Sequence, residues 1–392
     1  MKLAITVLEV DIGIIGCGIA GLTVSYYLLN DRVASSITIF ERRTLVPRKH
    51  CTGLVSLETL MKLPLASRFV ENMYRSMIFL IHGANFGIEI VADRYFACRI
   101  DRVRHEIELM RSLNEMGAVI NLGCDVTNIS SYNNKYSLTF KRGGEGLLST
   151  HFDKIVIAEG YPPKLSRKYG LSAKYDVLRA LQEEVSISSA LKNDQVETIY
   201  VFISPILFGK GFAWLVPIDR YRIIVGYATE YTSSIEMLEN VKQVFKNILK
   251  LSYRSVEDLY GGDVLQGYPI ATYANDILSI GDAVSMVKSI SGGGLYAISL
   301  ASKLYTRIIN LGGVEHYRAL RKLFKILRMQ YIIKNAAWNI LRHALSNTNI
   351  IGQVNKILSF NLKHLDYDRH DLLIYTFLTN FLGFKLKSID RI

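Results

Sequence analysis

The chain has 392 residues, of which 49% are hydrophobic and 21% are charged, and this ordinary globular composition excludes a largely disordered protein. Lysine and arginine total 47 against 35 for aspartate and glutamate, and residues 317–392 carry 13 of the basic but only 4 of the acidic side chains. This asymmetry indicates an anionic partner for the C-terminal part, such as a membrane surface, nucleic acid or an acidic ligand.

Buried strands and helices alternate through much of the chain, as in an α/β protein with a parallel sheet. An apolar run at residues 10–15, a helical pattern at 19–30 and a second apolar run at 36–41 form a β-α-β unit. Further elements of this unit are expected at residues 102–117, 153–158 and 276–280. We therefore predict a Rossmann-like nucleotide-binding domain.

A different pattern interrupts this domain. Residues 75–92 alternate around a glycine-containing turn, as in an antiparallel hairpin, and residues 196–229 contain strand-like runs. From about residue 315 the pattern is helical to the end of the chain. The predicted fold class is an α/β Rossmann-like domain with an inserted antiparallel β-sheet domain and a C-terminal helical region. The expected boundaries are 1–61, 96–165 and 265–315 for the first domain, 62–95 and 166–264 for the second, and 316–392 for the basic helical region.

A glycine motif stands where the first strand meets the first helix, at residues 16–21 (GCGIAG). Gly16 would make the tight turn, Gly18 would let the backbone approach a pyrophosphate, and Gly21 would let helix and strand pack closely. The helix N-terminus would offer unpaired N–H groups to the phosphates. Glu41 ends the second strand, where its carboxylate could accept from ribose hydroxyls. The alternative is a glycine-rich turn without a ligand.

A second glycine-rich stretch favours FAD over NAD. The strand at 276–280 delivers Gly281 and Asp282, and residues 292–294 are three glycines that open a helix. Asp282 could accept from a ribityl hydroxyl, and the glycines would let backbone N–H groups approach the flavin ring. The chain contains a single GxGxxG motif, so we expect one dinucleotide domain with FAD as its cofactor.

These features resemble the flavoproteins of the para-hydroxybenzoate-hydroxylase fold and, more narrowly, the geranylgeranyl reductase family, over about residues 10–310. Four segments are similar to motifs of that family: 47–54 (PRKHCTGL) to Lys-x-Cys-x-Gly, 99–101 (RID) to a longer Arg-x-x-Phe-Asp, 158–160 (AEG) to Ala-Asp-Gly, and 212–217 (FAWLVP) to Tyr-x-Trp-x-Phe-Pro. The family's Gly-Asp-Ala-Ala-Gly-x-x-x-Pro loop departs here, because Ser285 and Ser289 replace its last Gly and its Pro.

The resemblance implies the positions that contact the cofactor and the substrate. The implied FAD contacts are Gly16, Gly18, Ala20, Gly21, Glu41, Arg42, Arg99, Val126 through its backbone, Gly281, Asp282, Gly293, Gly294 and Leu295. Cys51 and Gly53 would lie near the isoalloxazine. Phe212, Trp214 and Pro217 would wall the substrate cavity.

The resemblance also implies a reaction, the reduction of C=C bonds in isoprenoid chains of lipid or quinone precursors. Reduced flavin would supply hydride, and an external donor, NAD(P)H or ferredoxin, would supply the electrons. An apolar cavity with Trp214 and Phe212 would suit a prenyl chain and transient positive charge on it. Cys51 and Trp214 are the candidate catalytic residues, with Cys51 as a proton donor or orienting group. The alternatives are that Cys51 only lines the site and that Trp214 only packs in the core.

Two other functions stay open. A flavin monooxygenase that hydroxylates a small aromatic compound has this fold, and a degenerate flavoprotein could bind lipid or a partner through its basic helices. The segment at 49–53 and Trp214 favour the reductase, whereas Ser285 and Ser289 keep the degenerate flavoprotein open.

The C-terminal region contains a basic amphipathic helix. Its basic face consists of Arg318, Arg321, Lys322, Lys325 and Arg328, and its apolar face of Leu320, Leu323, Phe324, Leu327 and Tyr331. Such a helix is either packed on a domain or attached peripherally to a membrane, and the apolar stretch 372–384 before Lys385 and Lys387 supports attachment. Nucleic acid is not expected, because no binding module accompanies the charge.

Four scattered cysteines without a CxxC pair fit a reducing compartment. No apolar run approaches about 20 residues, so we expect no transmembrane helix and a cytoplasmic protein, with peripheral membrane contact as the alternative. No metal is expected, because one acidic and histidine-rich stretch lacks regular ligand spacing and is interpreted as a solvated turn. That stretch comprises His364, Asp366, Asp368, His370 and Asp371.

Overall fold

The computed structural model describes residues 10–83, 86–345, 356–362 and 365–369. The first apolar run of the chain forms the centre of a parallel sheet. Ile12 and Ile14 of β1 (Asp11–Ile15) are fully buried, because both faces of the sheet are covered. The strand order is β20-β21-β12-β1-β2-β8, in which only the pairing of β20 with β21 is antiparallel. The other strands of this sheet are β2 (Ser36–Glu41), β8 (Val119–Leu122), β12 (Lys154–Ile157), β20 (Tyr273–Ala274) and β21 (Ile277–Ser279).

Helices cover one face of this sheet and a small antiparallel sheet covers the other. The helices are α1 (Ile19–Asn30), α3 (Arg102–Glu115) and α8 (Leu295–Leu311), and α1 packs against both of the others. The small sheet consists of β9 (Cys124–Tyr132), β10 (Lys135–Arg142) and β11 (Leu147–Phe152). Its Phe152 and Leu138 lie so close to Gly13 that a Cβ atom there would be 2.7 Å from the Phe152 ring. The predicted α/β unit is therefore present with its expected strands.

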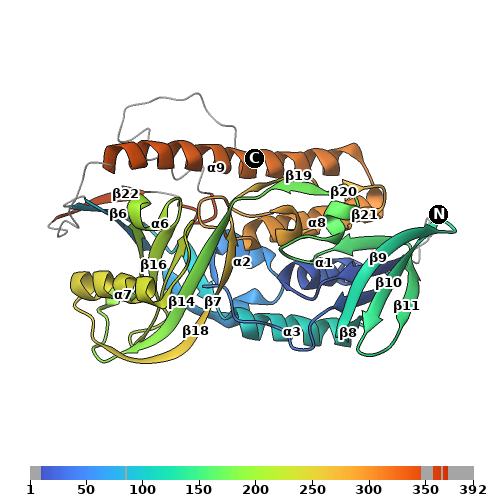
Figure 1. Ribbon diagram of the computed structural model, residues 1–392, viewed down its shortest axis with the longest axis horizontal. Helices are drawn as coiled ribbons and strands as arrows, with labels where there is room; N and C mark the ends of the chain where they lie inside the picture. The colour runs from blue at the N-terminus through green and yellow to red at the C-terminus, as the bar shows by residue number, and fades with distance from the viewer. Residues whose placement is uncertain (1–9, 84–85, 346–355, 363–364, 370–392) are drawn as a thin grey trace, which may run out of the picture.

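A second, larger sheet of eight strands lies at the other end of the molecule (Figure 1). Its strand order is β18-β14-β17-β16-β15-β5-β6-β22, and its pairings are antiparallel except β15 with β5 and β6 with β22. The predicted hairpin at 75–92 is its β5–β6 pair. The strands are β5 (Ser76–Ile81), β6 (Phe86–Ala92), β14 (Val177–Ile187), β15 (Thr198–Ile203), β16 (Phe212–Pro217), β17 (Arg222–Thr229), β18 (Tyr253–Leu265) and β22 (Lys356–Leu362).

Side chains of the large sheet alternate between two apolar clusters, because successive strand residues point to opposite faces. Ala213 and Leu215 pack with α7 (Ile235–Leu249), whose Phe245 is fully buried. Trp214 and Val216 belong to the cluster on the other face. Short helices flank this sheet, namely α5 (Asn193–Val196) and α6 (Pro205–Phe208).

Two small sheets join the large body to the α/β unit. One pairs β13 (Ser172–Lys174) with β19 (Tyr268–Ala271), and the other has the order β3-β7-β4, formed by β3 (Leu54–Ser56), β7 (Ala97–Ile100) and β4 (Val70–Tyr74). Three short helical elements complete this part, α2 (Leu57–Lys62), η1 (Ala66–Phe69) and α4 (Leu165–Lys168). The chain thus crosses between the two larger sheets several times, which brings early and late segments together.

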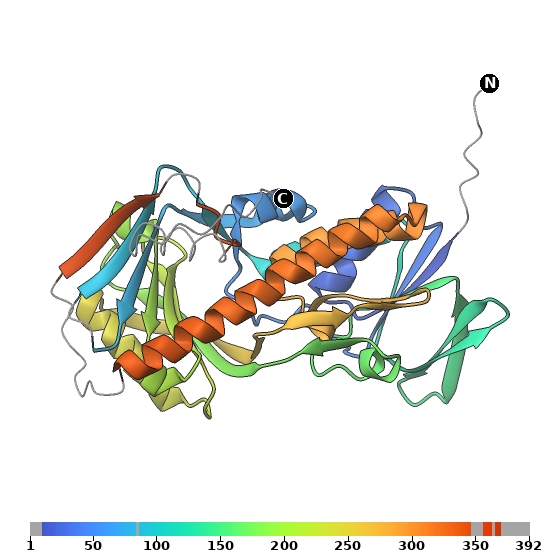
Figure 2. The same ribbon diagram turned by 90° about the horizontal axis from the view of Figure 1, so that it is seen from above.

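Helix α9 (Val314–Leu345) runs along the molecule from α8 to α6, as Figures 1 and 2 show. Leu320, Leu323 and Leu327 are buried in the core of the α/β unit. The basic side chains of the opposite face are exposed, as in a surface helix packed on a domain. In the described part of the chain, no helix combines the length and the apolarity that crossing a membrane requires.

The expectation of helix from residue 315 to the end is wrong for residues 356–362. These residues form β22, which pairs in parallel with β6 from Lys356 opposite Phe86 to Leu362 opposite Ala92. The backbone N–H and C=O groups of this segment form hydrogen bonds with β6 at the edge of the large sheet. Such pairing depends on a distant strand, so the local sequence pattern cannot predict it. The apolar stretch 372–384 and the lysines after it lie outside the described residues.

Candidate cofactor and substrate site

The glycine motif lies in the turn between β1 and α1. Gly16 has φ +111°, and a Cβ atom there would overlap the Ala158 carbonyl. A Cβ atom at Gly21 would overlap the Gly16 carbonyl, so this position needs glycine for close packing. Gly18 caps α1 and is accessible, and a Cβ atom there would meet no protein atom within 4 Å. The geometry therefore leaves open the one position that is predicted to face a ligand.

Glu41 lies beneath this turn at the end of β2. Its Oε2 accepts from the Cys17 amide at 2.9 Å and its Oε1 accepts from the Arg43 amide at 2.9 Å. These bonds orient the buried carboxylate at the mouth of the glycine turn, where a ribose hydroxyl would share its lone pairs. Arg42, the neighbouring predicted contact, is exposed.

The late glycine stretch contacts the early one directly. Gly281 has φ +76°, and a Cβ atom there would lie 2.8 Å from the Cβ of Ala20 in the first turn of α1. Asp282 follows in the short helix η2 (Gly281–Val284). A Cβ atom at Gly294, which caps α8 ahead of Leu295, would lie 3.6 Å from Asp282 Oδ1. The two predicted motifs therefore face one common space.

Asp282 is accessible to solvent and yet enclosed by protein, which indicates a recess rather than an open surface. Enclosure raises the pKa of Asp282, while the charges of His50 and Arg102 act in the opposite direction. His50 is likewise accessible and enclosed. Its pKa is lowered by burial and by Arg102, so its ring favours the neutral form.

Arg102 is a site residue that sequence reasoning missed. It is the first residue of α3, after the helix cap Asp101, and it is buried and paired with Glu106. Its Nε has no hydrogen-bond partner among the described residues, and its charge acts on the pKa values of His50 and Asp282. The 99–101 segment is shorter than the family's Arg-x-x-Phe-Asp motif that it resembles. This irregular spacing was a signal that Arg102, and not only Arg99, could lie near the cofactor.

Arg99 itself lies on β7. It is buried and forms an ion pair with Glu71 of β4. Burial lowers the pKa of Arg99, and the charges of Tyr260, Glu184 and Cys51 oppose this shift. Of the two arginines, Arg102 is the one whose charge acts on the pKa of Asp282.

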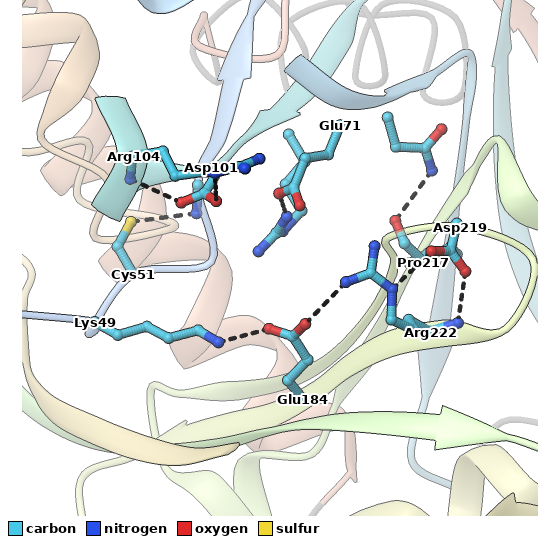
Figure 3. A network of polar contacts seen from close by, with 12 residues as sticks. Lys49, Cys51, Glu71, Asp101, Arg104, Glu184, Pro217, Asp219 and Arg222 are labelled. Atoms are coloured by element: carbon cyan, nitrogen blue, oxygen red, sulfur yellow. Dashed lines mark hydrogen bonds and ion pairs between the residues drawn. The ribbon is translucent and has the colours of Figure 1, made fainter. Parts of the chain in front are cut away.

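The segment around Cys51 is tied to both halves of the molecule. Gly53 has φ +83°, a Cβ atom there would overlap the Ile100 carbonyl, and its amide donates to Cys51 Sγ at 3.4 Å. Lys49 forms an ion pair with Glu184 of β14 at 2.6 Å (Figure 3). It forms a second ion pair with Asp258 of β18 at 3.1 Å. Cys51 is half-buried, whereas Cys17, Cys98 and Cys124 are buried.

Trp214 and Phe212 point from β16 to the same face, with ring centroids 5.6 Å apart. Gln182 of β14 accepts from Trp214 Nε1 at 3.3 Å and from Thr52 Oγ1 at 2.9 Å, so one side-chain oxygen joins the tryptophan to the Cys51 segment. The side chain of Pro217 points to the opposite face of β16 from Phe212 and Trp214. The Pro217 carbonyl accepts from Tyr74 Oη at 2.5 Å.

Two other predicted positions have structural contacts. Val126 lies on β9 opposite Phe140, with its side chain in the core of the α/β unit. Glu159 accepts from the amides of Lys164, Leu165 and Ser166 at 2.7–3.0 Å and so caps the start of α4. A carboxylate in the AEG segment therefore stabilises a local turn.

The interpretation of residues 364–371 as a solvated turn is wrong for Asp368, which is buried. Asp368 pairs with Lys288 of the loop between η2 and α8, because a buried carboxylate requires such compensation. Residues His364, His370 and Asp371 lie outside the described part. Within the described part, no group of three or more His, Cys, Asp or Glu side chains is arranged to hold a metal ion.

Gly293 packs against Lys288 in the same loop, where a Cβ atom would lie 2.9 Å from the lysine Cε. The predicted contacts thus form two groups. Asp282 lies beside the glycine turns, and its pKa is affected by His50 and Arg102. Trp214 is joined to the Cys51 segment through Gln182.

No family model matches the chain, but related proteins are found by sequence. The chain is 23% identical over 403 residues to an uncharacterized protein of Methanocaldococcus jannaschii, with 96% of the chain and 98% of the relative covered. It is 21% identical over 322 residues to digeranylgeranylglycerophospholipid reductase 1 of Methanopyrus kandleri, with 76% of the chain and 79% of that protein covered.

Solved structures have the same fold. A geranylgeranyl bacteriochlorophyll reductase-like protein from Thermoplasma acidophilum superposes with a TM-score of 0.73 at 14% identity, over 95% of the chain and 97% of that protein. A p-nitrophenol 4-monooxygenase from Pseudomonas putida superposes with a TM-score of 0.63 at 14% identity, over 88% of the chain and 95% of that protein. The predictions of an FAD cofactor and of an FAD-dependent oxidoreductase agree with these comparisons. The chain has the fold of the FAD-dependent oxidoreductases and resembles the digeranylgeranylglycerophospholipid reductases in sequence, which confirms the family resemblance that its motifs indicate.

Proposed function

We propose that the protein binds FAD and reduces C=C bonds of geranylgeranyl-type isoprenoid chains in lipid or quinone precursors. The observation that carries this proposal is the contact between the two glycine motifs at Ala20 and Gly281, with Asp282 enclosed but accessible beside them. A dinucleotide with a ribityl chain needs such a surface, since its pyrophosphate and its ribityl hydroxyls must be held at once.

Several features of the recess fit FAD. Gly18 offers a helix N-terminus with open space in front of it, which suits a pyrophosphate. Asp282 would accept from a ribityl hydroxyl, and Glu41 would share its lone pairs with a ribose hydroxyl. The unpartnered Nε of Arg102 would donate to an acceptor atom of the cofactor. When bound and reduced, FAD would supply hydride to the substrate.

The substrate would lie between the Cys51 segment and the face of the large sheet that carries Phe212 and Trp214. The two rings offer an apolar wall, and their π-faces would stabilise positive charge that develops on a prenyl carbon. The Gln182 bridge would hold Trp214 and the Cys51 segment at a fixed separation. Cys51, the cysteine that is not fully buried, is the side chain here that we assign to hold a proton for the substrate.

A flavin monooxygenase acting on an aromatic compound is the second candidate function. Its support is the shared fold with the p-nitrophenol 4-monooxygenase. The sequence relatives named as reductases and the Lys49–Gly53 match support the first proposal over this one.

A membrane surface is the proposed location of the lipid substrate. The exposed basic face of α9 would contact anionic headgroups, while Leu320, Leu323 and Leu327 pack inside the protein and are not available for insertion. The contact would therefore be electrostatic and weakened by salt. The electron donor would be NAD(P)H or ferredoxin.

The test begins with the purified full chain. Protein-bound oxidised flavin absorbs near ~450 nm, so a yellow protein, or one that turns yellow on reconstitution with FAD, would support the cofactor. The FAD-loaded protein is then incubated anaerobically with a geranylgeranyl lipid and a chemical reductant, and the lipid is analysed by mass spectrometry. A gain of hydrogen on the prenyl chain is the expected result.

The same preparation distinguishes the alternatives. Stoichiometric oxygen uptake with a hydroxylated aromatic product would favour the monooxygenase, and FAD binding without either turnover would favour a degenerate flavoprotein. A colourless chain that does not take up FAD would contradict the proposal at its first step. Gly18→Ala serves as the matched variant, since it should weaken FAD binding by about tenfold or more and lower the activity with it, while the protein stays folded.

A further inference from the structure

Residues 365–369 return from the edge of the large sheet to the interior of the protein. Tyr367 belongs to the same apolar cluster as Trp214, and its ring centroid lies 6.5 Å from that of Phe96. Tyr367 is only 8% exposed. A segment that begins 51 residues after the start of α9 thus lies in the apolar cluster that contains Trp214.

Asp368 fixes this segment to two elements of the candidate site. Its side chain is 1% exposed and accepts from Lys288 Nζ at 2.5 Å, from the Ser56 amide at 2.9 Å and from Thr59 Oγ1 at 2.5 Å. Burial alone would raise the pKa of Asp368, but the Lys288 ammonium lowers it, so the pair is charged. Ser56 ends β3, which follows directly after the Cys51 segment.

Lys288 in turn is part of the late glycine loop. Its amide donates to the Gly293 carbonyl at 3.0 Å, and its carbonyl accepts from the Gly292 amide at 2.8 Å. Its ammonium lies 4.4 Å from the centroid of the Tyr367 ring. The Asp368–Lys288 pair therefore connects residues 365–369 to the loop that is proposed to approach the flavin.

Tyr367 also lies near the Cys51 segment. Leu54, three residues after Cys51, packs against the same apolar cluster as Tyr367. Burial raises the pKa of Tyr367, and Asp368 and Cys51 contribute to the shift in the same direction. No other cysteine offers a half-buried thiol, since Cys17, Cys98 and Cys124 are buried.

The contacts of Asp368 indicate a permanent structure and not a plug that leaves during turnover. A buried carboxylate with three donors loses all of them if the segment moves out, and Lys288 would remain as an unpaired buried charge. Such a segment stays in place during a reaction cycle. Its Tyr367 side chain then stays in the apolar cluster that contains Trp214.

We propose that residues 365–369 form a fixed wall of the substrate site beside Cys51, that the Asp368–Lys288 pair holds this wall, and that Tyr367 limits the bulk of the chain that fits there. The identity of the substrate rests on the proposed function, whereas the wall itself does not. Tyr367 is thus a specificity-determining residue and Asp368 a positioning residue.

The test uses Cys51 as a reporter in the full chain, with and without FAD. The rate of alkylation by iodoacetamide is measured for the wild type, Tyr367→Ala, Tyr367→Phe and Asp368→Asn, and Cys51→Ser identifies the signal. We expect Tyr367→Ala and Asp368→Asn to accelerate labelling by about tenfold or more, because protection follows the free energy of local opening. Tyr367→Phe keeps the ring and should label at the wild-type rate.

The matched control breaks another buried ion pair. Lys242 and Glu183 lie 2.9 Å apart with side chains 8% and 6% exposed, on the α7 side of the large sheet. Glu183→Gln should destabilise the protein without accelerating Cys51 labelling. If Glu183→Gln accelerates labelling as much as Asp368→Asn, the effect is general loosening and the proposed wall is overturned.

A double substitution guards against misfolding of Asp368→Asn. Lys288→Met with Asp368→Asn removes both charges and keeps an oxygen that accepts from Ser56, so slow labelling should return, since removing a whole buried pair is tolerated better than breaking it. Persistent fast labelling in this double variant would contradict the role of the pair. If a folded Tyr367→Ala protein is labelled at the wild-type rate, the proposed wall is overturned, whether or not the protein binds FAD.

Specificity is tested last, with wild type and Tyr367→Ala acting on prenyl lipids of increasing bulk. The variant should gain turnover of bulkier chains relative to the geranylgeranyl lipid, and an unchanged ratio would overturn the specificity role. If the wild type binds no FAD or reduces no lipid, the proposed function fails, but the labelling result still decides the wall.

Discussion

Ala20 and Gly281 are in contact, although one lies near the beginning of the chain and the other in its last third. A Cβ atom at position 281 would lie 2.8 Å from the Cβ of Ala20, and Gly281 has φ +76°. The early glycine turn and the late Gly-Asp turn therefore form a single surface. A change at this contact should affect the fold and the cofactor site together.

Gly281→Ala should destabilise the protein by roughly 1–3 kcal/mol, because the new methyl group meets Ala20 and alanine disfavours a positive φ. Urea denaturation of the cofactor-free chain measures this free energy. Gly144→Ala is the control, since a Cβ atom there meets nothing within 4 Å and its φ is not positive. Equal stability of the two variants would contradict the close packing.

Gly18→Ala should separate cofactor binding from folding. A Cβ atom at Gly18 meets no protein atom, so the free energy of unfolding should change by less than about 1 kcal/mol. The same methyl group would stand where a pyrophosphate approaches, and FAD affinity should fall by about tenfold or more, roughly 1.4 kcal/mol per factor of ten. Fluorescence titration with FAD measures the affinity. Wild-type affinity would show that this turn does not hold the cofactor.

Gln182→Leu should destabilise the protein more than Trp214→Phe. Removing the Gln182 oxygen leaves both Trp214 Nε1 and the half-buried Thr52 Oγ1 without this acceptor. The unsatisfied buried donor of Trp214 alone costs about 1–3 kcal/mol. Trp214→Phe removes a single donor and keeps an aromatic ring. Chemical denaturation of both variants gives the comparison, and the reverse order would argue that the bridge has little structural weight.

Lys334 should make stability depend on pH. Its ammonium is buried on α9 and donates to Gln266 Oε1 at 3.0 Å, with Asp176 4.0 Å away. Burial lowers the pKa of Lys334 from 10.5 to about 8, the charge of Lys210 acts in the same direction, and Asp176 and Glu230 oppose the shift.

The sign follows from proton binding. Between pH 8 and pH 10.5 the unfolded chain keeps a proton on Lys334 that the folded protein has released, so the free energy of unfolding rises with pH. The rise should total roughly 3 kcal/mol and should be absent in Lys334→Met. Denaturation of both proteins across this window measures the difference. Parallel pH profiles would show that Lys334 keeps an ordinary pKa in the folded protein.

Local patterns were sufficient for the α/β unit. The strands at β1, β2, β12 and β21 and the turn at Gly16, Gly18 and Gly21 follow from apolar runs and glycine spacing. These features can be predicted locally, because a buried strand requires consecutive apolar residues and a strained turn requires glycines at fixed positions nearby. The segment around Cys51 and the strand with Trp214 were likewise found from short motifs.

The chain by itself thus determined the α/β unit and its glycine turns, and the family resemblance predicted the role of the residues around Cys51. Only the tertiary structure decided that Arg102, rather than Arg99, is coupled to Asp282, that residues 356–362 pair as a strand with β6, and that Asp368 is buried against Lys288. Each of these depends on partners distant in sequence. Strand pairing and the burial of charged groups depend on which distant residues the folded chain brings together. The local hydrophobic periodicity of the sequence does not contain that information.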